Sequence, residues 1–137
     1  MRLQAFVPHY MDPHYHQYRP TNLTVHPTNT NGSGSGDGSV RYGEDFSVRF
    51  WLGRRPSEDV EYAAYAPPFT THSMSMNQRM LRLRAKGTRR SDDGWVSAVL
   101  EAPPHANVAP AGYYMLTVVN GGIPSVSQWV RFTHHAN

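Results

Sequence analysis

The sequence contains no cysteine among its 137 residues. The absence of thiols excludes a disulfide framework, a thiolate zinc site, an iron–sulfur cluster and a cysteine nucleophile. Lysine is almost absent as well, because twelve of the thirteen basic residues are arginine. Such a bias can accompany phosphate binding, but arginines on the solvated faces of strands are the ordinary explanation, and the formal net charge is only +3.

Long apolar segments are also missing. No run approaches the roughly 20 residues that a membrane-spanning helix needs, and the first eight residues lack the apolar centre of a signal peptide. We therefore expect no membrane contact and no signal peptide within this chain. Glycine-rich phosphate loops and a Gly-x-Ser-x-Gly nucleophile turn are absent from the sequence too.

What the chain does contain is enough apolar material for one core. Hydrophobic residues make up 39%, with 3 Trp, 8 Tyr and 5 Phe. Eleven glycines and eleven prolines indicate many turns. The length and composition together predict one domain with few long helices.

Apolar and polar residues alternate with the period of two that half-buried strands show, most clearly at Phe46, Val48 and Phe50. Short strands that recur about every ten to fifteen residues, without a sustained helical period, predict an all-β antiparallel β-sandwich. The strands are expected at residues 3–7, 23–25, 46–52, 60–64, 80–84, 95–101, 113–120 and 125–132.

The expected organisation is a lead-in segment at 1–20 that packs on the sandwich, a single β-sandwich domain at 21–134 and a tail at 135–137. Glycine and serine make residues 28–39 a flexible loop within that domain, and residues 87–94 are expected to be a polar turn. Tyr113 or Tyr114 is predicted to anchor a corner of the sandwich through its hydroxyl. The predicted core comprises Phe46, Val48, Phe50, Leu81, Leu83, Leu116, Val118, Val126 and Val130.

Most histidines have an ordinary interpretation. His14 and His16 would point the same way on a strand and could share a metal, but they lie in a proline-bounded irregular segment, which favours surface histidines. His26 and His105 are expected in loops. The pair at 134–135 is expected to belong to a frayed end.

His72 is a stronger candidate. It lies in residues 67–79, which join two predicted strands, are rich in Thr, Ser and Met, and carry little charge before Arg79. A neutral imidazole on such a hairpin can reach a neighbouring domain and bind a transition metal. On chemistry alone an exposed loop histidine is the commoner outcome. No catalytic or cofactor-binding residue is predicted.

Two long motifs favour His72 as a metal ligand. Residues 71–80, THSMSMNQRM, and residues 109–125, APAGYYMLTVVNGGIPS, closely resemble segments of the glyoxal oxidase and galactose oxidase family of copper-radical oxidases. The lead-in PHYMDP at residues 8–13, followed by Arg19 and Pro20, resembles plant members of that family. The resemblance covers residues 5–132. It implies the family's C-terminal domain, an immunoglobulin-like early-set β-sandwich that packs against a seven-bladed β-propeller.

The resemblance also implies a role for His72. In the family, a hairpin of this domain donates one histidine to copper, and His72 matches that position. The propeller supplies the other ligands and a tyrosine cross-linked to cysteine, which this cysteine-free chain cannot form. The expected function is thus a non-catalytic domain that donates His72 to a propeller absent from this chain, in cis or in trans. Copper is expected only together with that propeller, where the whole enzyme would oxidise aldehydes or alcohols and produce hydrogen peroxide.

By the same resemblance the location is extracellular or cell wall, and the sequons at Asn22 and Asn31 give weak support. The alternative function is a stand-alone module that has lost its oxidase partner and binds protein or glycan. Nucleic-acid binding through the arginine-rich residues 79–90 is disfavoured, because acidic residues balance much of the charge and no aromatic residues interleave with the arginines.

Overall fold

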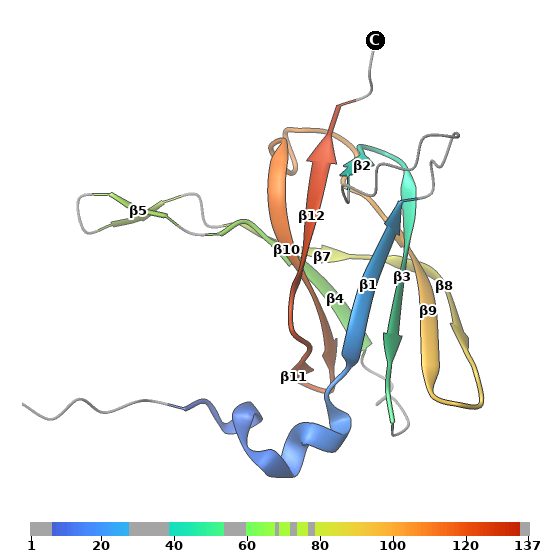
Figure 1. Ribbon diagram of the computed structural model, residues 1–137. Helices are drawn as coiled ribbons and strands as arrows, with labels where there is room; N and C mark the ends of the chain where they lie inside the picture. The colour runs from blue at the N-terminus through green and yellow to red at the C-terminus, as the bar shows by residue number, and fades with distance from the viewer. Residues whose placement is uncertain are drawn as a thin grey trace, which may run out of the picture.

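The structure is a computed structural model that describes residues 7–27, 39–53, 60–67, 69–71, 74–76 and 79–134. Two sheets pack face to face as a β-sandwich (Figure 1). The first sheet has the strand order β1-β3-β9-β8. Its strands are β1 (Thr21–Pro27), β3 (Asp45–Trp51), β9 (Trp95–Glu101) and β8 (Ala85–Arg90).

The second sheet has the order β2-β12-β10-β4-β7, and a short strand, β11, also pairs with β10. Its strands are β2 (Ser39–Arg41), β12 (Gln128–Thr133), β10 (Gly112–Asn120), β4 (Val60–Tyr65), β7 (Met80–Leu83) and β11 (Ile123–Pro124). Within each sheet, neighbouring strands run antiparallel, as expected, except that β2 pairs in parallel with β12. The remaining strands, β5 (Phe69–Thr71) and β6 (Met74–Met76), pair only with each other.

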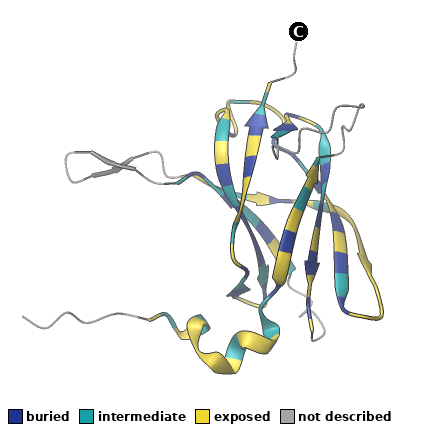
Figure 2. Cartoon of the chain, in the orientation of Figure 1, coloured by how far each residue is buried: buried dark blue, intermediate teal, exposed yellow. Residues whose placement is uncertain are grey.

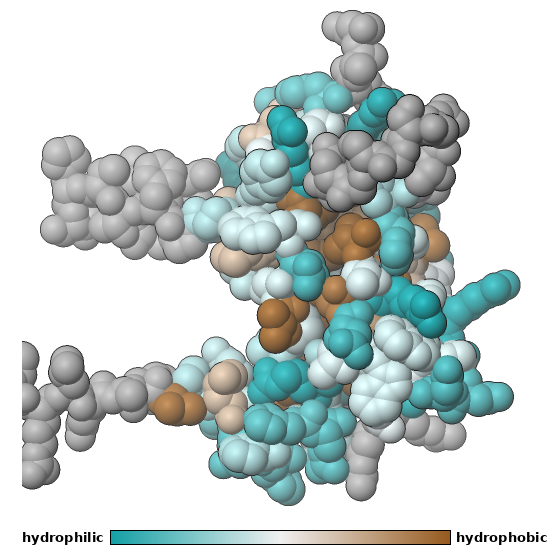
Figure 3. Space-filling view, in the orientation of Figure 1, coloured by the Kyte–Doolittle hydropathy of each residue, from teal (hydrophilic) through white to brown (hydrophobic). Residues whose placement is uncertain are grey.

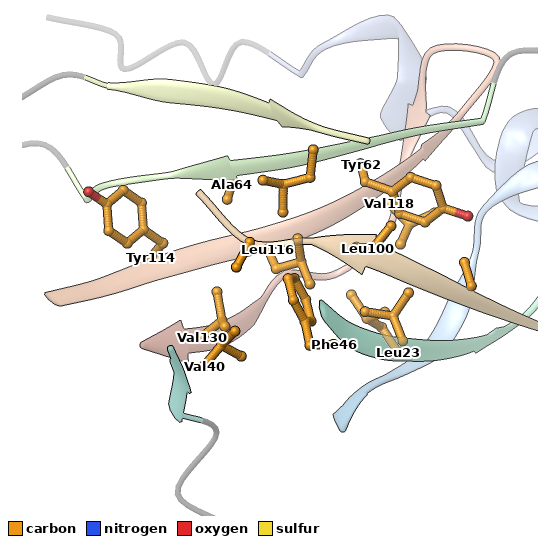
Figure 4. Close-up of a cluster of buried hydrophobic side chains, with 14 of the residues drawn as sticks. Leu23, Val40, Phe46, Tyr62, Ala64, Leu100, Tyr114, Leu116, Val118 and Val130 are labelled. Carbon is orange, nitrogen blue, oxygen red and sulfur yellow. The ribbon is translucent and has the colours of Figure 1, made fainter. Parts of the chain in front are cut away.

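The core lies between the sheets, and the alternation of the strands builds it. Figure 4 shows Phe46 and Leu100 of the first sheet turned toward Leu116 and Val118 of the second, and all four are fully buried. Figure 2 shows the same alternation of buried and exposed residues along the strands. The sequence prediction is confirmed for Phe46, Val48, Phe50, Leu83, Leu116, Val118 and Val130, whereas Leu81 is half-buried and packs on the edge of the core.

Val126 was wrongly predicted as a core residue, because its side chain is 77% exposed. The predicted strand at 125–132 begins three residues later, at Gln128. Ser125 is buried instead, and its hydroxyl oxygen accepts a hydrogen bond from the Val118 backbone N–H at 3.0 Å. The Ser125 backbone N–H also donates to the Val118 carbonyl at 2.8 Å, so Ser125 is held against β10 while the next side chain lies in solvent.

The polar turn predicted at residues 87–94 is confined to residues 91–94, where the Gly94 N–H donates to the Ser91 carbonyl. For residues 87–90 the prediction was wrong, because they belong to β8, which pairs with β9 with a shift of register between Ala85 and Gly87. All residues from Lys86 to Arg90 are exposed, so this edge strand has no apolar face for the period of two to reveal. Of the strand predicted at 3–7, residues 3–6 lie outside the described residues and Val7 is not in a strand.

The lead-in forms two 3-10 helices, η1 (His9–Met11) and η2 (Pro13–Tyr18). Arg19 attaches it to the second sheet, since its guanidinium donates to the Pro124 carbonyl at 2.7 Å and to the Tyr10 carbonyl at 2.6 Å. The buried Asn120 adds a hydrogen bond from its side-chain amide to the Tyr18 carbonyl at 2.9 Å. The contacts of Arg19 with Pro124 and of Asn120 with Tyr18 span 105 and 102 residues of sequence, so they could not be predicted from local patterns.

Candidate functional site

The candidate site begins where β4 and β7 leave the second sheet. Tyr65 and Met80 are their last paired residues. Just beyond them, the Ala66 N–H donates to the Arg79 carbonyl at 3.0 Å. The two segments then continue into β5 and β6, which stand away from the sandwich as a hairpin (Figure 1). His72 follows β5 in the sequence and lies outside the described residues, so its role as a ligand stays a prediction.

Arg79, at the base of the hairpin, is hydrogen-bonded to the backbone of a loop of the sandwich. We call residues 107–110 the carbonyl run, because each of its four carbonyl oxygens accepts a side-chain hydrogen bond. Arg79, next to the hairpin, donates from Nη1 to the carbonyls of Asn107 at 3.3 Å and Val108 at 2.8 Å. The run therefore connects the base of the hairpin to the body of the domain.

Two tyrosines hold the other half of the carbonyl run. The Tyr42 hydroxyl donates to the Ala109 carbonyl at 2.6 Å, and the Tyr114 hydroxyl donates to the Pro110 carbonyl at 2.8 Å. The corner anchor predicted at residue 113 or 114 is thus confirmed for Tyr114. Burial raises the pKa of both phenols above the usual value. Both hydroxyls consequently remain protonated donors well above neutral pH.

No complete metal centre lies within the described ranges, because they hold no group of three or more His, Cys, Asp or Glu side chains placed to bind a metal ion. His14 and His16 lie on η2, where three residues make a turn, so residues two apart point in different directions. His26 was wrongly expected in a loop and lies in β1. His105 is exposed in the loop before the carbonyl run, as expected.

The described part of the surface includes two hollows whose lining residues bring no catalytic groups together. One, of about 340 Å³, lies at the junction of the lead-in and β12, where Arg19 is its only charged lining residue. That guanidinium is already bonded to two carbonyls. The other, of about 350 Å³, lies over β8 and β9, and its charged lining residue is Arg89.

The basic residues of β7 and β8 are partly neutralised. Lys86 forms ion pairs with Asp45 at 3.0 Å and Glu101 at 3.6 Å, and Arg82 lies 3.7 Å from Glu61. The hydrogen bond to Asp45 is the main cause that raises the pKa of Lys86. Among the described residues, no helix is both long enough and apolar enough to cross a membrane.

The fold and the hairpin define the class of protein: an immunoglobulin-like sandwich that extends one hairpin and carries no metal centre of its own among the described residues. Residues 19–132 match the family described as "Galactose oxidase-like, Early set domain". The chain therefore belongs to the galactose oxidase-like early set domain family.

Similar proteins of known sequence are much longer than this chain. It is 35% identical over 136 residues to aldehyde oxidase GLOX1 of Arabidopsis thaliana, covering 96% of this chain and 20% of that protein. It is 34% identical over 131 residues to aldehyde oxidase GLOX of Vitis pseudoreticulata, covering 96% and 23%. The chain thus spans about a fifth of the length of these relatives.

A solved structure agrees with these relatives. The chain resembles a fungal alcohol oxidase of the AA5 family, determined in complex with copper, with a TM-score of 0.60 and 25% sequence identity. The match covers 84% of this chain and 20% of the fungal oxidase. In both sequence and structure, the domain corresponds to a minor part of a larger oxidase.

The sequence prediction found Tyr114 but not the other two donors to the carbonyl run, Arg79 and Tyr42. Arg79 lies within the THSMSMNQRM motif, so its position was noticed, but its acceptors are some thirty residues away. No sequence pattern pointed to Tyr42, because it follows a short strand next to the glycine-rich residues and its acceptor, the Ala109 carbonyl, lies 67 residues later in the chain.

Proposed function

We propose that this chain is the non-catalytic β-sandwich domain of a copper-radical oxidase of the glyoxal oxidase and galactose oxidase type. His72 would be one copper ligand, donated to a β-propeller domain in cis or in trans. The observation that carries the proposal is the hairpin at β5 and β6, which stands off the sandwich, and the THSMSMNQRM motif runs from the last residue of β5 to the first residue of β7 (Figure 1). Two further findings support the proposal: the chain belongs to the early-set family, and it spans about a fifth of the length of its relatives.

The donor chemistry fits one ligand of a shared site. A neutral imidazole is a good copper ligand, but several convergent ligands are needed for tight binding. The described residues do not supply the others, and the chain has no cysteine for a radical cross-link. Copper, where bound, would supply the oxidation chemistry, and this chain would present the imidazole next to β5, while Arg79 bonds the base of the hairpin to the carbonyl run.

The proposal places the protein outside the cell or in the cell wall, where such an oxidase would release hydrogen peroxide. The exposed Asn22, which begins a sequon in β1, is accessible to glycosylation and supports that location.

The test is a chimera in which this chain replaces the matching fifth of the Arabidopsis relative. We expect the chimera to retain copper through dialysis and to produce peroxide from an aldehyde, and expect His72→Ala to lose both. His105→Ala, which removes an exposed histidine of the sandwich, is the matched control and should change neither. Unchanged copper content and peroxide output in the His72→Ala chimera would refute the ligand assignment.

A further inference from the structure

The outward face of the first sheet is a surface that the proposed function does not use. Alternate residues of β3 and β9 are buried in the core, so the residues between them face solvent. Register partners point to the same side of a sheet and therefore form rows across the strands. One row, which we call the basic row, consists of Thr24, Arg49, Ser97 and Arg89 on β1, β3, β9 and β8. Figure 3 shows hydrophilic side chains that project from this side of the sandwich.

A hollow of about 350 Å³ adjoins the basic row. Its lining includes Ser97 and Arg89 of that row, and Ser47, Val99 and Gly87 of the row beside it. The hollow is open because several side chains around it are short. Gly87 has none, and a Cβ added there would meet no atom within 4 Å. Val99, which is 39% exposed, makes part of the lining apolar.

The two arginines of the basic row carry positive charge that no neighbouring carboxylate pairs with. Among the described residues, no ion pair includes Arg49 or Arg89. Asp45 and Glu101, which lie toward one end of this face, are both paired with Lys86. No acidic side chain lines the hollow. The middle of the face is thus positive and attracts an anion from solution.

Arg49 is held in position by an aromatic ring. Its guanidinium lies 4.2 Å from the centroid of the Trp95 ring. Trp51 is the register partner of Trp95, and its own ring is fixed by a hydrogen bond from Nε1 to the Asp93 carbonyl at 3.0 Å. A guanidinium stacked on a ring keeps the N–H groups at its edge available. Arg49 can therefore bind a carboxylate with little further loss of side-chain entropy.

The spacing of the two arginines favours a ligand with more than one negative charge. They lie on β3 and β8, with β9 between them, so their backbones are two strand spacings, about 10 Å, apart. Each guanidinium can take its own carboxylate in a bidentate hydrogen bond. The space between them offers the hydroxyls of Ser47 and Ser97, which can bond to ligand hydroxyls. Val99 can contact the C–H face of a sugar ring.

We propose that the basic row and the adjoining hollow bind an acidic polysaccharide made of hexuronate units. Two carboxylates of the chain meet Arg49 and Arg89, and one sugar ring lies in the hollow at Gly87. The inference goes beyond the proposed function, because it involves neither His72 nor copper. A nucleic acid fits less well, since each of its strands presents a charge about every 3.4 Å, whereas this face offers two arginines and has Asp45 toward one end.

The test measures binding of a galacturonic acid hexamer to the 137-residue chain by isothermal titration calorimetry. The methyl-esterified hexamer is the matched ligand, because it keeps the sugar rings and lacks the charges. We expect the acid to bind, and the ester to bind weaker by about tenfold or more. Arg89→Gln should weaken binding of the acid by a similar factor. Arg131→Gln removes the same charge from an exposed position of the second sheet and should leave binding unchanged.

A further variant tests the hollow without changing the charge. Gly87→Phe should fill the hollow and abolish binding of the acid hexamer. Because Gly87 is exposed and an added Cβ has room, the variant should keep the thermal melt of the parent chain. Unweakened binding by a folded Gly87→Phe variant would overturn the placement of the sugar ring.

Other results would overturn the inference as a whole. Equal binding of the acid and the ester, or equal losses in Arg89→Gln and Arg131→Gln, would show that this face does not recognise hexuronate. Tighter binding of single-stranded RNA or of a polyglutamate peptide, abolished by Arg89→Gln, would assign the face to another class of partner. None of these measurements depends on copper, so the copper content of the His72→Ala chimera tests the proposed function separately.

Discussion

Replacing Tyr114 by phenylalanine tests whether the carbonyl run holds the domain together. The substitution keeps the ring, which packs at 5.2 Å from the Phe132 ring, and removes only the hydroxyl that donates to the Pro110 carbonyl. No cavity forms, so the change isolates one hydrogen bond from a side chain that is 3% exposed. Such a bond contributes about 0.5–1.5 kcal/mol net.

Pro110 is itself exposed, so water can partly replace the lost donor and the larger penalty of an unsatisfied buried carbonyl does not apply. We therefore expect the free energy of unfolding to fall by about 1 kcal/mol. For a domain of this size that corresponds to a decrease in Tm of roughly 3–5 °C. Urea unfolding followed by circular dichroism and by tryptophan fluorescence measures the change.

The matched control is Tyr113→Phe, one residue earlier and 55% exposed. It should change the free energy of unfolding by less than about 0.5 kcal/mol. If Tyr114→Phe and Tyr113→Phe unfold at the same urea concentration, the hydroxyl bond does not stabilise the domain. Tyr42→Phe combined with Tyr114→Phe should be non-additive by about 0.5 kcal/mol or more, since both donate to the same loop.

Two further perturbations address other parts of the sandwich. Burial raises the pKa of Tyr42, Tyr62 and Tyr114, so their contribution to stability is complete below pH 10 and decreases as pH rises above it toward their folded pKa values. Urea unfolding between pH 8 and about pH 11 should show this loss, and a flat profile would contradict it. Gly94→Ala should cost about 1–3 kcal/mol, because Gly94 has φ +96° and an added Cβ would lie 3.1 Å from the Leu52 carbonyl. Gly87→Ala, where an added Cβ meets nothing within 4 Å, should be close to neutral in the same thermal melts.

Local alternation was sufficient to predict most of the sandwich, because each of the central strands has one buried and one exposed face. At Phe46, Val48 and Phe50 the pattern and the burial agree residue by residue. The prediction was wrong where that condition does not hold. The edge strand β8 is exposed along most of its length, and Ser125 is held against β10 by two hydrogen bonds with Val118, seven residues away, which the local composition does not indicate.

The candidate site was less accessible to sequence reasoning than the fold. His72 was selected by its motif, and its role as a ligand stays a prediction. Arg79 and Tyr42 bond to residues of the carbonyl run that are far away in the sequence. Tyr114 bonds to a carbonyl only four residues earlier. A short-range bond of this kind could be predicted, and the long-range ones could not.

The carbonyl run has a consequence for how the sequence of this loop can vary. Arg79, Tyr42 and Tyr114 recognise main-chain oxygens, which every amino acid presents in the same way. The side chains of Asn107 and Val108 are exposed and take no part in that recognition. Related chains can therefore replace the residues at the exposed positions 107 and 108 while the three donors outside the loop are retained, whereas the buried Ala109 is restricted by packing in the core.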